Sequence, residues 1–84
     1  ILENSFGEVL SIYPNPTTGI FSVDLGAIFE SSVVSITDIS GRLIDSKTIS
    51  QSKILNLSIQ EPSGIYIVSI QAGDKNAVIR LIKE

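Results

Sequence analysis

The clearest structural signal in the chain is the stretch IFSVDL at residues 20–25, in which apolar and polar side chains alternate. A period of two places Phe21, Val23 and Leu25 on one face of an extended strand and the polar side chains on the other. The stretch therefore predicts a half-buried β-strand.

Apolar stretches of this kind recur along the chain, with turn residues between them. The predicted strands are Val9–Tyr13, Ile20–Leu25, Ser32–Thr37, Arg42–Ile49, Ile54–Ile59, Ile65–Gln71 and Asn76–Ile82. Short strands at roughly 8 to 12 residue spacing, without a helical period, are typical of a small β-sandwich or barrel. We predict an all-β fold, a small Ig-like β-sandwich of about seven antiparallel strands.

The same alternation predicts which side chains face the interior. They are Leu10, Ile12, Phe21, Val23, Leu25, Val34, Ile36, Leu55, Leu57, Ile59, Tyr66, Val68, Ile70, Ile79 and Leu81. Lys47 and Arg80 belong to the fourth and seventh predicted strands. We expect those strands to be exposed edges, where a charge discourages pairing with another chain.

Length and composition predict one folded domain. A chain of 84 residues buries about 60% of its unfolded surface, and 43% of these residues are hydrophobic. No cysteine is present, so packing and strand pairing must supply the stability. We assign residues 9–84 to the domain and residues 1–8 to a linker or lead-in. Because the sequence contains no methionine, we expect it to be part of a longer protein.

The net charge and the absence of certain residue types argue against several functions. The net charge of −3 disfavours nucleic-acid binding, and no apolar run approaches the ~20 residues of a membrane span. Without histidine or cysteine the chain lacks the commonest general base, the thiol nucleophile and the usual transition-metal ligands. We expect a non-catalytic domain with no cofactor and no metal site.

Two polar stretches between predicted strands have the composition of rigid turns. Pro14, Asn15 and Pro16 must end the first strand, since proline fixes φ and removes a backbone donor, and Gly19 completes the turn. From Asp38 to Gly41 the chain fits a type I turn, with Asp accepting backbone N–H bonds and Gly taking a positive φ. Arg42 either pairs with Asp38 or lies in solvent.

A third motif, Pro62-Ser63-Gly64-Ile65-Tyr66, resembles the tyrosine corner of Greek-key sandwiches. In that arrangement a tyrosine near the start of a strand bonds its hydroxyl to the backbone a few residues upstream. We therefore expect a structural role for the hydroxyl of Tyr66.

These motifs, in this order and followed by an apolar terminal strand with Arg80 and Lys83, resemble the C-terminal sorting domain of type IX secretion substrates. The subtype is type A, also called the Por secretion system tail domain, of Bacteroidota-type bacteria. The resemblance covers Val9 to Glu84. It departs from the family at Thr37, where a larger residue is common, and in having fewer lysines near the end.

The resemblance implies a secretion signal that brings a covalently joined upstream cargo to the type IX translocon for export across the outer membrane. A cell-surface sortase of the cysteine-peptidase class then removes the domain. Its route would run through the periplasm to the cell surface or the extracellular space. We expect Gly64, Tyr66, Arg80 and Lys83 to be recognised by the translocon. The structural motif residues would be Pro14, Asn15, Pro16, Gly19, Asp38, Gly41 and Arg42. Strand augmentation by the terminal strand is the docking mode we consider.

Composition leaves a rival open, an Ig-like or fibronectin-like accessory module that binds glycan or spaces domains in a secreted protein. A glycan-binding face usually presents exposed aromatic side chains. Here there are only two tyrosines and three phenylalanines, most of them expected in the core. A self-associating structural module is a third possibility, which would form a concentration-dependent dimer.

Overall fold

The computed structural model describes residues 3–7 and 10–84 and is all-β, with 73% of residues in strands. Six strands are present in these ranges: β1 (Glu3–Asn4), β2 (Ser11–Tyr13), β3 (Ile20–Asp38), β4 (Leu43–Ser58), β5 (Gly64–Ala72) and β6 (Lys75–Lys83). All strand pairs are antiparallel. No helix in the described ranges has the length and apolar character needed to cross a membrane.

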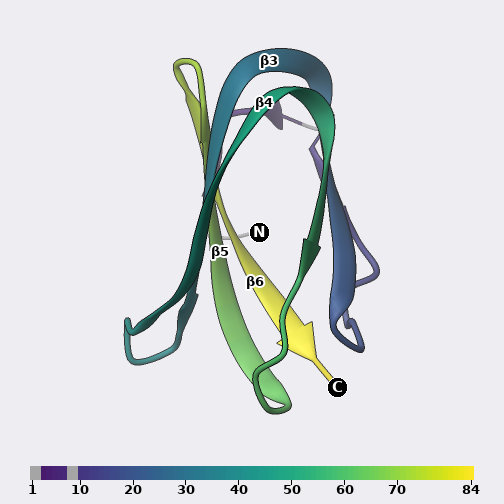
Figure 1. The fold of residues 1–84 in the computed structure, drawn as a ribbon, viewed down its shortest axis with the longest axis vertical. Coiled ribbons are helices and arrows are strands. Elements are labelled where there is room, and N and C mark those ends of the chain that lie inside the picture. Colours follow the sequence, from purple (N-terminus) through teal and green to yellow (C-terminus); the bar gives the residue numbers. More distant parts are fainter. Residues whose placement is uncertain (1–2, 8–9) are drawn as a thin grey trace.

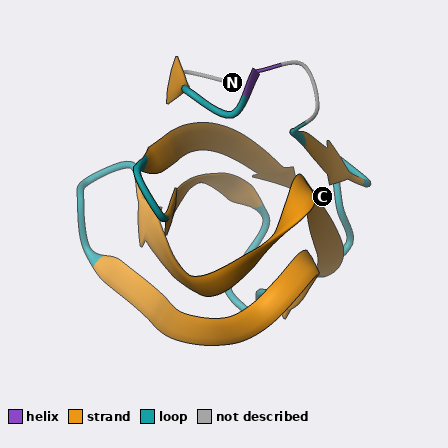
Figure 2. Cartoon of the chain, turned by 90° about the horizontal axis from the view of Figure 1, so that it is seen from above, coloured by secondary structure: helices purple, strands orange, loops and turns teal. Residues whose placement is uncertain are grey.

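The strands form one curled sheet in the order β1-β6-β5-β3-β2, with β4 also paired to β3. Both β3 and β4 arch over one end of the molecule and continue down the opposite side (Figure 1). The first half of β3 pairs with β2 and the end of β4, whereas its second half pairs with β5 and the beginning of β4. Seen along the long axis, the strands curl around a common interior (Figure 2).

The bends of β3 and β4 have a local cause in each strand. The pairing register shifts between Asp24 and Phe29, as at a β-bulge, and Gly26 takes a φ of 85° there. The Asp24 carboxylate accepts the backbone N–H of Gly26 at 2.9 Å, which stabilises this turn of the chain. On the facing strand Gln51 has a φ of 47°. These irregularities let both strands change direction while remaining paired.

The all-β prediction is confirmed, but the strand count differs. Two pairs of predicted strands, 20–25 with 32–37 and 42–49 with 54–59, are each one long bent strand. The alternation of apolar and polar residues resumes after each bend. The turn-like residues between the two halves of each long strand were therefore interpreted as strand ends. Seven separate strands in an Ig-like sandwich are therefore not confirmed. Val9, the predicted start of the first strand, lies outside the described residues.

The core prediction is largely confirmed. All of the predicted inward residues are buried except Ile12, which is partly buried and packs against the same cluster. Ala72, Ala77 and Phe6 also belong to the core. Burial of this apolar surface, at about 25 cal/mol per Å², is the main stabilising contribution in a chain without disulfides.

Part of the predicted lead-in packs onto the domain. Glu3 and Asn4 pair with Val78 and Ala77 of β6, and the ring of Phe6 is only 7% exposed. The Phe6 ring meets that of Phe29 edge to face, with centroids 5.6 Å apart. Ile1, Leu2 and Glu8 of the lead-in lie outside the described residues. The boundary between cargo and domain stays a prediction.

The two predicted edge strands have different outcomes. Within the described residues β4 pairs only with β3, so one edge of β4 is open, and Lys47 lies on it as expected. The last strand is not an edge, because β6 pairs with β5 on one side and with β1 on the other. The exposed edge expected at Arg80 is therefore wrong.

Candidate functional site

The side chain of Asn15 occupies the place of a neighbouring strand beside β6. Its Nδ2 donates to the carbonyl of Arg80 at 2.9 Å, and its Oδ1 accepts the backbone N–H of Ile82 at 3.0 Å. A parallel strand would use one backbone N–H and one C=O for the same purpose, and the adjacent bridge between Thr17 and Lys83 is parallel. One carboxamide therefore satisfies two edge groups of the terminal strand.

Thr17 continues this contact by two residues. Its backbone N–H donates to the carbonyl of Ile82 and its carbonyl accepts the N–H of Glu84, both at 2.8 Å. The Thr17 hydroxyl donates to the carbonyl of Ile20 at 2.7 Å and accepts the N–H of Gly19 at 3.0 Å. We call Asn15 and Thr17 together the terminal-strand clamp.

Glycine is required next to the clamp. Gly19 has a φ of 142°, and a Cβ atom there would lie 3.2 Å from the carbonyl oxygen of Ile59. The Gly19 carbonyl accepts the N–H of Ile59 at 2.7 Å, so this close approach carries a bond between two chain segments. Pro14 and Pro16, each after a cis peptide bond, flank Asn15 in the turn that follows β2. As predicted, the strand ends immediately before Pro14, because β2 ends at Tyr13.

The predicted tyrosine corner is present on the other side of the terminal strand. The Tyr66 hydroxyl donates to the carbonyl of Pro62 at 2.6 Å, and its ring is buried. The Lys83 ammonium donates to the carbonyl of Glu61, the residue before this proline. Gly64 begins β5 directly opposite Lys83. The corner and the end of β6 are therefore bound to each other.

The Asp38 carboxylate organises the hairpin between β3 and β4. Its Oδ1 accepts bonds from the hydroxyl and N–H of Ser40 and from the N–H of Arg42, at 2.7 to 3.0 Å. These bonds, led by that of the Ser40 hydroxyl, hold the pKa of Asp38 well below its usual range. Gly41 takes a φ of 93°, so the predicted turn chemistry is confirmed.

The hairpin reaches the tyrosine corner through Arg42. Its Nε lies 3.1 Å from Asp38 and its Nη2 lies 3.6 Å from the carboxylate of Glu61. The Arg42 side chain is 67% exposed, so solvent screens both ion pairs and they add little to stability. Of the two alternatives for Arg42, the structure has the ion pair with Asp38.

These contacts bring together motifs that are far apart in the sequence. The clamp bonds to Ile82, near the end of β6. The Asp38 hairpin reaches Glu61 of the tyrosine corner through Arg42, and Glu61 in turn accepts a bond from Lys83 of β6. Of the residues expected to be recognised by the translocon, Gly64 and Arg80 are exposed. Tyr66 is buried, and Lys83 is partly buried and bonded within the molecule.

Sequence reasoning missed two members of this arrangement. Thr17 could have been found from the sequence, because it places a hydroxyl directly after the Pro-Asn-Pro turn, where such side chains commonly bond the local backbone. Glu61 contributes mainly its backbone carbonyl, so no side-chain pattern points to it.

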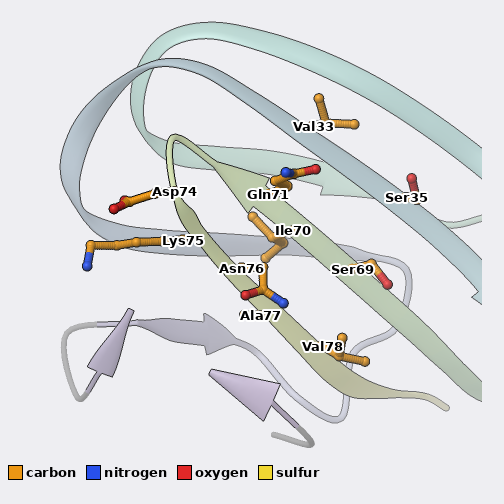
Figure 3. A pocket seen from close by; sticks show the side chains of 10 residues that line it. All are labelled: Val33, Ser35, Ser69, Ile70, Gln71, Asp74, Lys75, Asn76, Ala77 and Val78. Atoms are coloured by element: carbon orange, nitrogen blue, oxygen red, sulfur yellow. The ribbon is translucent and has the colours of Figure 1, made fainter. Parts of the chain in front are cut away.

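A shallow hollow of about 390 Å³ lies on the outer face of β3, β5 and β6, away from this arrangement. Figure 3 shows the side chains that line it, among them Ser69, Gln71 and Asn76. Its ionisable side chains are Asp74 and Lys75, beside the β5–β6 turn. Within residues 3–7 and 10–84 no cluster of three or more acidic, histidine or cysteine side chains could hold a metal ion.

A comparison with models of protein families matches most of the chain. The model of a family described as the secretion system C-terminal sorting domain matches residues 11–84. No curated protein matches the chain. The matched range contains the terminal-strand clamp, the Asp38 hairpin, the tyrosine corner and β6.

Proposed function

The chain belongs to the family of C-terminal sorting domains of type IX secretion, and from this we propose that it is recognised as a folded domain by the translocon. Such domains serve as C-terminal secretion signals, direct export toward the cell surface or extracellular space, and are generally non-catalytic. The family is one of Bacteroidota and their outer membrane. In our proposal the cargo is joined upstream and passes through the periplasm in transit.

The observation that carries the proposal is the convergence of the family motifs on the terminal strand. Asn15, Thr17 and Lys83 each contribute bonds that hold the end of β6 to the rest of the domain. A signal read as a loose peptide would not need such contacts. The contacts favour recognition of a folded surface that includes the end of β6.

We propose two different roles for the four residues expected to be recognised by the translocon. Gly64 and Arg80 are exposed and would contact the translocon directly. Tyr66 and Lys83 would position that surface, since their polar groups are bonded to Pro62 and Glu61. Augmentation along the edge of β6 is not part of the proposal, because β1 and the clamp occupy that edge.

The pairing of β1 supports a proposal about where a sortase would cut. Peptidases bind their substrates as extended chains, and a cut between Glu3 and Phe6 would require β1 to unpair and the Phe6 ring to leave the core. We therefore place removal of the domain by a sortase-type cysteine peptidase upstream of Glu3. The accessory-module alternative receives no support, since Tyr13 is the one highly exposed aromatic side chain among the described residues.

The test is export of a fluorescent protein that carries a Sec signal and residues 1–84 at its C-terminus. Extracellular fluorescence is measured in type IX competent cells and in a translocon-deficient strain. Translocon-dependent export that is lost on deletion of residues 80–84 supports the proposal. Retention of a well-folded fusion in the periplasm of competent cells contradicts it.

A further inference from the structure

An exposed apolar surface lies on the outer face of the sheet near the end of β6. Leu43, Ile65 and Ile82 are 58%, 44% and 36% exposed, and Ile67 is partly exposed. We call these four residues the apolar outer patch. Their side chains point outward, because the residues that alternate with them along β5 and β6, Tyr66 among them, are buried.

The pairing register makes this patch contiguous across four strands. Ile65 lies directly opposite Ile82, and Ile67 lies between Thr37 of β3 and Arg80 of β6. Thr37 is in turn opposite Leu43 of β4. Side chains directly opposite in antiparallel strands have Cβ atoms about 5 Å apart, so the four apolar side chains form one surface.

The other end of the same outer face is different in character. There the outward positions include the polar residues Ser35, Ser46, Ser69 and Gln71, and the valines Val33 and Val78. A sheet with one face in water normally alternates apolar inward and polar outward residues. Val33 lies opposite Gln71 and Val78 lies opposite Ser69, so each valine has a polar neighbour. Near the end of β6, in contrast, the apolar side chains of Ile65 and Ile82 lie directly opposite each other.

The patch carries positive charge. Arg80 is exposed beside Ile67, and within the described residues its guanidinium takes part in no ion pair. Neither the four patch residues nor Thr37 and Arg80 include a carboxylate. An acidic group on a partner would therefore complement the patch, and burial of the isoleucines would strengthen that interaction.

The geometry points to the apolar outer patch as the docking surface for a protein of the type IX machinery, through an apolar area that has an acidic group opposite Arg80. This inference rests on the proposed function and names the chemistry of its partner. A second copy of the chain fits less well, because its own patch would bring Arg80 toward Arg80. An anionic lipid surface would repel a chain of net charge −3.

The experiment uses the fluorescent export fusion with two matched double substitutions. Ile65→Thr with Ile82→Thr removes apolar area from the patch and keeps β-branched residues. Val33→Thr with Val78→Thr is the control: it replaces a methyl group by a hydroxyl at two outward positions on the other end of the same face. Export of the patch variant is expected to fall about tenfold or more, as for loss of a central interface contact, and that of the control less than about twofold. Thermal unfolding of the purified domains ensures that both variants are folded.

Charge is tested separately with Arg80→Gln and Arg80→Glu. Against an acidic partner, export should fall in the order wild type, Gln, Glu, since the last change adds repulsion. Equal export of Arg80→Glu and wild type overturns the acidic partner. Wild-type export by the folded patch variant overturns the docking surface while leaving the sorting function intact. Failure of the wild-type fusion to export refutes the sorting function itself.

Two further measurements test whether a second copy of the chain or a lipid surface binds the apolar outer patch instead. Sedimentation of the purified 84-residue domain would reveal a patch-dependent dimer, and flotation with vesicles of phosphatidylethanolamine and phosphatidylglycerol would reveal patch-dependent lipid binding. Either result overturns a translocon protein as the occupant. A monomer that does not float, combined with loss of export by the patch variant, supports it.

Discussion

The carboxamide of Asn15 contacts β6 through both of its polar atoms, at Arg80 and Ile82. No aliphatic side chain can provide a donor and an acceptor at this spacing. An aspartate would retain the acceptor and leave the Arg80 carbonyl without its donor. The physical requirement at this position is therefore an amide, held by two flanking prolines.

Replacing Asn15 with alanine should lower the free energy of unfolding by about 1 to 2 kcal/mol, because two backbone groups of β6 lose their partner. Urea unfolding of the purified domain measures this. Asn56→Ala is the matched control, since it removes only one exposed side-chain bond, to Ser22, and should cost less than about 0.5 kcal/mol. Equal losses would argue against the clamp.

Replacing Tyr66 with phenylalanine should destabilise the domain by about 1 to 3 kcal/mol, since the Pro62 carbonyl would lose its donor in a partly buried place. Tyr13→Phe removes a hydroxyl from a ring that is 46% exposed and should be nearly neutral. Thermal and urea unfolding of the two variants are compared. A neutral Tyr66→Phe would contradict the structural role of the corner.

Asp38 should make stability depend on pH in acid. Its pKa is lowered below the usual 3.8, so its contribution is fully present above that value and is lost as the pH falls below it. Asp38→Asn should reduce stability at neutral pH and flatten the pH dependence between about pH 4 and about pH 2. Urea midpoints across this range measure the effect. The same pH dependence in wild type and in Asp38→Asn would contradict this role of the carboxylate.

At the scale of elements, β4 has an open edge along its 16 residues. The register places Lys47 opposite the buried Val34, so Lys47 points toward the inner side of the sheet from its edge. An inward charge on an open edge strand opposes pairing with a second chain. This gives the charge of Lys47 a role on the open edge of β4.

Lys47→Val should therefore increase self-association of the domain without unfolding it. Sedimentation velocity over a range of concentrations measures the change in average mass. The same substitution at Lys75, in a strand that pairs on both sides, should leave the domain monomeric. If both variants remain monomeric at high concentration, the charge of Lys47 does not protect the edge.

At the scale of the whole molecule, the described part of the lead-in and the terminal strand depend on each other. β1 covers one part of the β6 edge, the terminal-strand clamp covers the next, and the Phe6 ring enters the core near Phe29. The two ends of the described chain are thus joined through one strand. Any event that removes the lead-in uncovers part of β6.

Phe6→Ala should lower the free energy of unfolding by about 3 kcal/mol, since it removes a buried aromatic ring. Ile28→Ala, at a side chain that is 73% exposed, should cost less than about 1 kcal/mol. Differential scanning calorimetry of both variants gives the comparison. A small effect of Phe6→Ala would place residues 3–7 outside the cooperative unit.

Local sequence patterns were sufficient to predict the all-β class, nearly all of the core, the turn at Asp38 and the tyrosine corner. Each of these depends on alternation or on turn chemistry, which act over a few residues. The family resemblance was also carried by local motifs in a given order. Within the candidate site, the sequence therefore identified Asn15, Asp38 and Tyr66 one by one.

The arrangement of these local pieces became known only from the folded molecule. The merging of four predicted strands into β3 and β4, the burial of Phe6 and the bonds of Asn15 to β6 all join segments that are far apart in the chain. Such contacts depend on register and sheet curvature, which no local pattern encodes. For the same reason the apolar outer patch, assembled from four strands, becomes visible only in the folded molecule.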